Sequence, residues 1–270
     1  MNFRKIPGFL LFVAVAACAP RQTTIPNTPE ALFQQAQELY QKGEYSRAAQ
    51  LFQQFIFRYP TSGLADDAQF YLAESYFRQK DYDQAIIEYR FLIDNFPSMN
   101  YVPKAELRIA EAYLRKSPPP ELDQTDTEQA IRLFRRFLAR YPDSPLADTA
   151  RLLLAQAKEK LAQKMLIAAV TYRNLKMYDA EKFYLDLLLR EYPESQAAWQ
   201  AKYYLAEYYL VQNQPDKATP LIYEIIEDSN ASPSLIRKAK ILGLKYRIWP
   251  FKKLETLEKA SSTTVEDHSP

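Results

Sequence analysis

Glycine, histidine and cysteine are scarce in this sequence of 270 residues, and each shortage excludes a kind of chemistry. A phosphate-binding loop needs several small residues close together, but the four glycines are scattered: Gly8, Gly43, Gly63 and Gly243. The only histidine, His268, is the third residue from the C-terminus. That position excludes serine–histidine and cysteine–histidine pairs and metal sites built on histidines. We therefore expect no enzyme activity, no cofactor and no bound metal.

The net positive charge of the whole chain equals the surplus at its N-terminus. The chain has 35 lysines and arginines against 33 aspartates and glutamates, and the two surplus cations, Arg4 and Lys5, lie within the first 17 residues. From Cys18 onward the two signs are equal in number. The chain therefore lacks the long-range positive potential that attracts nucleic acid. We do not expect nucleic acid as a partner.

The N-terminus has the pattern of an export signal. Arg4 and Lys5 precede an apolar stretch at positions 9–17, which as a helix would span about 14 Å against a hydrocarbon core of ~30 Å. This is too short for a permanent transmembrane anchor. The small residues directly before Cys18 (Val15-Ala16-Ala17) resemble the lipobox of bacterial lipoproteins. Residues 1–17 are therefore predicted to be a lipoprotein signal peptide, with an ordinary signal peptide as the alternative.

Cys18 is the only cysteine and therefore has no disulfide partner, which in an exported protein calls for another use of the thiol. The lipobox resemblance implies that Cys18 becomes a lipid-modified N-terminus, and several acyl chains together anchor a protein stably. Residue 19 is alanine, not the aspartate that retains lipoproteins at the inner membrane. The resemblance thus implies the periplasmic face of the outer membrane. Residues 18–28 are predicted to be a polar tether.

The rest of the chain repeats itself in a fixed frame. Each unit ends in an aromatic–proline pair, and the closing prolines are Pro60, Pro97, Pro142 and Pro193. A tyrosine precedes its proline by 15 residues in three units: Tyr45, Tyr82 and Tyr178. The first interval, from Pro60 to Pro97, is 37 residues. This length fits a helix-turn-helix unit with a short linker.

Two longer intervals are explained by visible interruptions. A proline-rich insertion at residues 117–126 accounts for the first, and we expect it between the two helices of the third unit. Residues 146–173 contain no proline or glycine, so one long helix opening the fourth unit accounts for the second. A fifth unit follows with Pro215 in the turn between its helices.

This pattern resembles the tetratricopeptide repeat (TPR). In the first unit, small Ala36 and Ala48 alternate with large Phe52, at spacings that place them on one face of paired helices. The predicted fold is all-α: an α-α superhelix of five TPR units with a C-terminal capping helix, and an irregular helical bundle is the alternative. We expect units one to three at residues 29–142, units four and five at 143–232, and the capping helix with a flexible tail at 233–270.

The first helices of such units line a concave surface that binds other polypeptides. The repeat frame places these residues there: Phe33, Gln37, Tyr40, Phe70, Glu74, Phe77, Arg78, Lys104, Leu107, Arg108, Glu111 and Arg115. Aromatic rings beside cations suit an extended peptide with aromatic side chains and a terminal carboxylate. We call these residues the predicted groove. The alternative is that neighbouring units cover the aromatic rings.

The lipobox, the five units, the insertion at residues 117–126, which also carries acidic residues, and the long helix together resemble the BamD family. Members of this family belong to the machine that assembles outer-membrane β-barrels. Matching stretches begin at Ala36, Gly43, Asp123 and Leu161. The resemblance implies a scaffold that engages unfolded outer-membrane proteins through units one to three. It further implies docking of units four and five on a periplasmic POTRA domain of BamA, alongside other Bam lipoproteins.

Two other readings compete with this one. The first is another periplasmic TPR adaptor, either a CpoB-like envelope-constriction factor or a pilotin-like lipoprotein. The other is a carboxylate-dependent enzyme that uses Asp123, Asp126 and Glu128. For these acids we favour a structural role, in which Asp126 or Thr127 caps the second helix of the third unit.

Overall fold

The computed structural model describes residues 27–96 and 100–248, and over these residues the chain folds into eleven α-helices. The predicted signal peptide, Cys18, most of the tether, Pro97 and the predicted tail lie outside the described residues. The helices are α1 (Pro29–Gln41), α2 (Tyr45–Arg58), α3 (Ala65–Arg78), α4 (Tyr82–Asn95), α5 (Val102–Lys116), α6 (Thr125–Arg140), α7 (Ala147–Asn174), α8 (Tyr178–Glu191), α9 (Gln196–Val211), α10 (Pro215–Glu227) and α11 (Pro233–Lys245).

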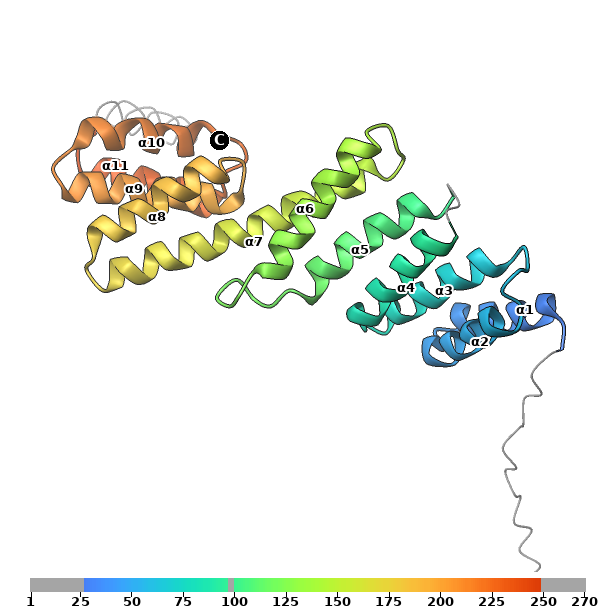
Figure 1. Ribbon diagram of the computed structural model, residues 1–270. Helices are drawn as coiled ribbons and strands as arrows, with labels where there is room; N and C mark the ends of the chain where they lie inside the picture. Colours follow the sequence, from blue (N-terminus) through green and yellow to red (C-terminus); the bar gives the residue numbers. More distant parts are fainter. Residues whose placement is uncertain (1–26, 97–99, 249–270) are drawn as a thin grey trace, which may run out of the picture.

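The helices stack in chain order into an elongated array, with α1 at one end and α10 and α11 at the other (Figure 1). Each helix packs on the next along the chain, and odd-numbered helices also contact odd-numbered neighbours, such as α1 with α3 and α7 with α9. Helix α11 packs on α9 and α10 and is the last helix of the array among the described residues. The predicted superhelix of five TPR units with a capping helix is confirmed.

The core is built from small and large residues in alternation. In each unit, buried alanines let the backbones of the paired helices approach each other, and one large side chain of the second helix fills the space beside them. These large side chains are fully buried: Phe52, Tyr89, Phe134, Leu185 and Ile222. Burying a side chain of this size stabilises the fold by about 1.5–3 kcal/mol. The large residues that recur in the sequence repeat are thus the residues that fill the core.

The aromatic–proline pairs end the second helices as predicted. Tyr59, Tyr141 and Tyr192 follow α2, α6 and α8, and each backbone N–H donates to the carbonyl four residues earlier, at 2.8–2.9 Å. Their φ angles lie between −131° and −136°, outside the helical region. A following proline excludes the helical conformation for the residue before it and cannot donate a backbone bond itself.

The two predicted interruptions are both present. Helix α7 runs over 28 residues, one position displaced from the predicted 146–173, and the insertion separates α5 from α6. The long helix also holds the insertion. The Lys160 ammonium donates to the Ser117 carbonyl at 2.8 Å, and the Lys164 ammonium donates to the Leu122 carbonyl at 2.6 Å. The third unit is therefore fastened to the helix that opens the fourth.

The predicted cap of α6 is wrong. The helix begins at Thr125, and the capping position falls on Gln124, so Asp126 and Thr127 lie inside the first turn. The Thr127 hydroxyl is buried and donates to the Gln124 side chain at 2.7 Å, whereas the Asp123 carboxylate accepts from the Thr125 backbone N–H at 3.0 Å. The Gln124 amide is held in turn by carbonyls of the insertion. The loop, not a side-chain cap, fixes where this helix starts.

Candidate peptide groove and docking surface

A chain of polar contacts crosses the first three units along the odd-numbered helices. Tyr40 on α1, Glu74 on α3 and Arg108 on α5 are spaced 34 residues apart in the sequence. This spacing is shorter than the repeat interval of 37 residues by about one helical turn. The Tyr40 hydroxyl lies 3.5 Å from one Glu74 oxygen, and the Arg108 Nε donates to the other at 2.6 Å. One carboxylate thus joins three units. The structure brings these three predicted groove residues together.

Glu74 is almost fully buried, with 3% of its surface exposed. Tyr89 on α4 donates its hydroxyl to the same carboxylate at 2.5 Å. Burial of Tyr89 and the negative charge of Glu74 raise the pKa of this tyrosine well above its ordinary value. Tyr89 therefore remains a protonated donor. A buried carboxylate is costly unless it is paired, and here a guanidinium and a hydroxyl supply the pairing.

Glu111 on α5 extends this network toward the solvent. Its carboxylate is buried and accepts from Arg108 Nη1 at 2.7 Å and from Arg115 Nη2 at 3.1 Å. The Arg108 guanidinium also lies over the Phe77 ring, 4.9 Å from its centroid. Arg108 is therefore held on three sides, by Glu74, Glu111 and Phe77. Arg115 is exposed, so the network ends in a cation that solvent and ligands can reach.

The phenylalanines of the predicted groove are half-buried. Phe33 packs edge-on against Phe52, Phe55 and Tyr71. Phe70 stacks on Tyr101 with ring centroids 4.6 Å apart. Neighbouring aromatic rings therefore cover one side of each, and only part of each ring remains for a ligand.

The remaining predicted residues differ in accessibility. Arg78 and Lys104 reach solvent, whereas Leu107 is buried. Gln37 is half-buried, and its side chain makes no hydrogen bond to any other residue that the structure describes. The accessible members of the predicted groove are thus chiefly its cations, with part of the Phe77 ring.

Sequence reasoning missed Tyr89, which completes the Glu74 site. Tyr89 occupies the position that Phe52 and Phe134 fill in the neighbouring units. A tyrosine hydroxyl at a buried position needs a partner, so the exchange of phenylalanine for tyrosine was the signal. Glu74, 15 residues earlier and on the facing helix, is that partner.

A second network of the same kind joins units four and five. Arg173 on α7 and Glu207 on α9 are again 34 residues apart, and Arg173 Nη2 donates to Glu207 at 2.6 Å. The Tyr203 hydroxyl donates to Glu207 at 2.9 Å, and burial together with this carboxylate raises the pKa of Tyr203 to about 12. Glu181 on α8 is buried, and its Oε1 lies 3.8 Å from the Arg173 Nε. Its burial raises its pKa, because the distant guanidinium compensates its charge only in part.

Large apolar side chains gather at the turns beside this second network. They follow α7 and end α9, and they are exposed: Leu175, Met177, Tyr178 and Val211. We call them the turn patch. A cavity of about 380 Å³ lies beside them, lined by Tyr178 and Val211 and by the charged side chains of Arg173 and Glu207. An exposed apolar cluster rimmed by charge is typical of a protein-binding surface.

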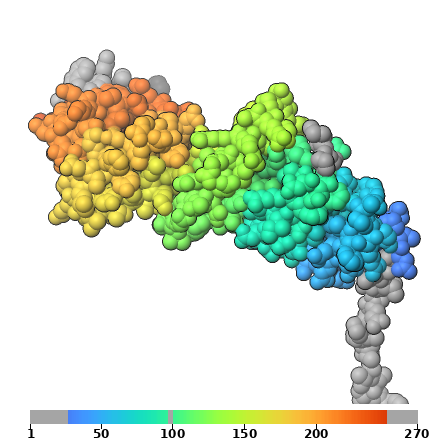
Figure 2. Space-filling model, in the orientation of Figure 1, coloured from blue at the N-terminus to red at the C-terminus, as the bar shows by residue number. Residues whose placement is uncertain are grey.

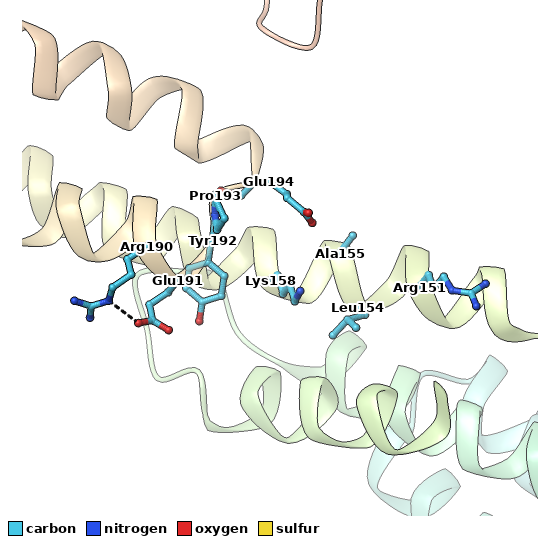
Figure 3. A pocket seen from close by; sticks show the side chains of 10 residues that line it. Arg151, Leu154, Ala155, Lys158, Arg190, Glu191, Tyr192, Pro193 and Glu194 are labelled. Carbon is cyan, nitrogen blue, oxygen red and sulfur yellow. Dashed lines mark hydrogen bonds and ion pairs between the residues drawn. The ribbon is translucent and has the colours of Figure 1, made fainter. Parts of the chain in front are cut away.

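A larger cavity of about 560 Å³ lies within the fourth unit, where α8 ends and the chain turns toward the fifth. Figure 3 shows it between the middle of α7, with Leu154 and Lys158, and the turn from α8 to α9, with Tyr192 and Pro193. The Glu159 carboxylate fastens that turn to α7 by accepting from the Gln196 backbone N–H at 2.6 Å.

Neither a metal site nor a membrane span is evident in the part of the chain that the structure describes. Over residues 27–96 and 100–248, no three histidine, cysteine, aspartate or glutamate side chains are grouped to hold a metal ion. Over the same residues, no helix combines the length and the apolar composition needed to cross a bilayer.

Comparison with known proteins gives one match by family and several by fold. The family model YfiO, described as "Outer membrane lipoprotein", matches residues 26–220. No curated protein sequence matches the chain.

The solved structures that resemble the chain have low sequence identity to it. A thermophilic TPR protein from Thermus thermophilus is 17% identical, with 78% of this chain and 97% of that one covered and a TM-score of 0.35. A protein from Bacteroides ovatus, described as a protein binding protein, is 18% identical, covers 73% and 98%, and has a TM-score of 0.40. At such identities the likeness concerns the fold alone.

Replacing the buried carboxylate should destabilise the whole array. We expect Glu74→Leu to lower the free energy of unfolding by about 2–4 kcal/mol, because Arg108 and the Tyr89 hydroxyl lose their partner inside the protein. Arg78→Ala is the control: Arg78 is half-exposed and its Nε lies 3.9 Å from Glu74, so less than about 1 kcal/mol should be lost. Urea unfolding followed by circular dichroism measures both. Equal losses would show that Glu74 does not hold the units together.

The two carboxylates beside Arg173 should respond oppositely to neutralisation. Because the pKa of Glu181 is raised in the folded state, its charge is penalised at neutral pH; this penalty vanishes below the pKa of an unfolded glutamate. The free energy of unfolding of Glu181→Gln, measured relative to that of the native chain, should therefore be higher at pH 7 than at pH 4. Glu207→Gln removes the close partner of Arg173 and should lower stability at pH 7. Urea unfolding at both pH values tests this, and a loss at pH 7 in Glu181→Gln as large as in Glu207→Gln would contradict it.

Proposed function

The chain belongs to the YfiO family of outer membrane lipoproteins, and from this we propose that it is a non-catalytic adaptor in the assembly of outer-membrane β-barrels. In this proposal, Cys18 carries the lipid and holds the protein on the periplasmic face of the outer membrane. Units one to three receive segments of unfolded outer-membrane proteins, and units four and five dock on a POTRA domain of BamA. The family match over residues 26–220, which spans nearly all of the TPR array, carries the proposal.

The accessible cations of units one to three support a peptide groove. Lys104 and Arg115 reach solvent from α5, and Arg78 does so from α3. Lys104 lies over the Tyr101 ring, on which Phe70 stacks, and Arg78 directly follows Phe77 in the chain. Neighbouring aromatic rings cover one side of Phe70 and of Phe77. A carboxylate at the end of an extended peptide would find unpaired or loosely paired cations here, and its aromatic side chains would find ring surface. Glu74 and Glu111 are buried, and Arg108 compensates their charge, so they repel such a ligand weakly.

The turn patch supports docking through units four and five. Its apolar side chains are exposed at the edges of two neighbouring units, so a partner could bury them together. The Arg173 network fixes α7 against α9 directly beneath. A rigid base with exposed apolar side chains is what a stable protein interface requires. A CpoB-like or pilotin-like adaptor would use the same fold with a different partner, so the identity of the partner decides between these functions.

The groove predicts a charge-dependent loss of peptide binding. Lys104→Glu together with Arg115→Glu should weaken the binding of an outer-membrane-protein peptide with a C-terminal aromatic residue about tenfold, which is ~1.4 kcal/mol. Arg132→Glu with Arg136→Glu makes the same change of charge on the exposed side of α6 and should leave binding nearly unchanged. Fluorescence anisotropy with a labelled peptide measures both. Equal affinities for the two double variants would rule out the groove.

The turn patch predicts a loss of partner capture. Leu175→Ser together with Val211→Ser should reduce co-purification of a POTRA-bearing barrel protein from detergent-extracted membranes about fivefold or more, because the interface loses two buried apolar side chains. Leu152→Ser, at a similarly exposed leucine on α7, is the control.

The two failures of this experiment differ in meaning. If the barrel protein co-purifies with the double variant as well as with the native chain, the turn patch is not the docking surface. If no POTRA-bearing protein co-purifies with the native chain either, the alternative adaptor functions are favoured over β-barrel assembly.

A further inference from the structure

The last helix that the structure describes, α11, has an unusual outer surface. The terminal helix of a repeat array normally presents a polar face to the solvent. One face of α11 packs on α9 and α10 through Leu235, Ala239 and Leu242, which are buried. The opposite side carries Ile241, 59% exposed, and Leu244, 43% exposed. Solvent exposure of two large aliphatic side chains on a capping helix calls for a partner surface.

The same helix is strongly basic. Residues 231–248 contain five cations and no acidic residue: Arg237, Lys238, Lys240, Lys245 and Arg247. Four of the five are exposed, all but Lys240. Within the residues that the structure describes, none of these four has a hydrogen bond or ion pair to an acid; Lys245 lies over the Tyr246 ring at 5.3 Å. From Cys18 onward the two signs are equal in number, so outside residues 231–248 the 33 acidic residues outnumber the 28 cations, and this basic end is a local feature.

Three of the exposed cations and both apolar side chains share one face of the helix. Arg237, Ile241 and Leu244 follow one another at intervals of four and three residues, and Lys238, Ile241 and Lys245 at intervals of three and four. Residues at these intervals line a single face. An apolar strip flanked by cations is the pattern of a helix that lies in the surface of a bilayer, with its cations on the lipid phosphates.

We propose that α11 binds the surface of a membrane containing anionic phospholipid. Charge complementarity selects this occupant, since three exposed cations of the helix without acidic partners among the described residues, Arg237, Lys238 and Lys245, flank the apolar strip. The end of the family match at residue 220 leaves α11 outside the matched residues, so the helix is an addition to what the match covers. The inference does not depend on the proposed role in β-barrel assembly.

The position of α11 gives this contact a mechanical consequence. Helix α1, which follows the proposed lipid anchor, and helix α11 lie at opposite ends of the elongated array (Figure 1), and the space-filling view shows the same separation (Figure 2). Attachment at one end alone would let the array swing about its tether. A second contact at α11 would hold the array lengthwise along the membrane.

Vesicle sedimentation tests the proposal directly. The full mature chain with Cys18→Ser, which cannot be acylated at that position, is mixed with vesicles of phosphatidylglycerol and phosphatidylcholine or of phosphatidylcholine alone. We expect binding to the anionic vesicles only, weakened by about 0.5 M salt. Both Arg237→Glu with Lys238→Glu and Ile241→Ser with Leu244→Ser should weaken it about tenfold or more. Arg132→Glu with Arg136→Glu on α6, a matched change of charge, should leave it within about twofold.

Three results would overturn the proposal. One is failure of the chain with native α11 to bind anionic vesicles at low salt, and another is equal binding to neutral vesicles. The third is that the α11 variants bind vesicles normally but lose a protein that co-purifies from membranes, which would make the face a protein interface. Unchanged helicity by circular dichroism shows that the substituted side chains, which are exposed, do not act through unfolding.

Discussion

The buried carboxylate of Glu74 is the interaction on which the first half of the array depends. It contacts side chains from all three N-terminal units, with Tyr40 before it, Tyr89 beside it and Arg108 after it. A charge so deeply buried is tolerated only when its partners are in place. The relative positions of α1, α3 and α5 are therefore fixed by chemistry that apolar packing alone does not supply. Arg173 and Glu207 repeat this arrangement at the same spacing of 34 residues in the second half.

The charged residues on this surface fall into two groups, those that pair with one another inside the protein and those that solvent can reach. Glu74, Arg108 and Glu111 are used in holding the units together, whereas Lys104 and Arg115 extend from the same wall into solvent. A groove whose curvature is fixed in advance loses less entropy when it binds a flexible peptide. The same logic applies to the turn patch, where exposed apolar side chains stand on helices that the Arg173 network holds. In both halves, the proposed binding surface thus lies on helices that a buried polar network holds in place.

The sequence predicted the architecture well because the relevant signals are local and periodic. Proline after an aromatic residue ends a helix, and the lack of proline and glycine in residues 146–173 allows a long one, which α7 confirms. Side-chain contacts depend on neighbouring units and were harder to predict. The start of α6 was misplaced because carbonyls of the insertion, and not a nearby side chain, hold Gln124. The turn patch has no period, since its members come from two separate turns. The roles of the groove residues and of Cys18 remain predictions.

Site-specific photo-crosslinking in intact cells tests the proposed function most directly. A photoreactive amino acid replaces Lys104, within the predicted groove, or Arg136, on the exposed side of α6, while outer-membrane proteins are being exported. A groove that receives unfolded barrel proteins predicts crosslinks to these substrates from position 104 and few from position 136. Crosslinks of equal yield from both positions, or none from position 104 while the substrates accumulate, would contradict it.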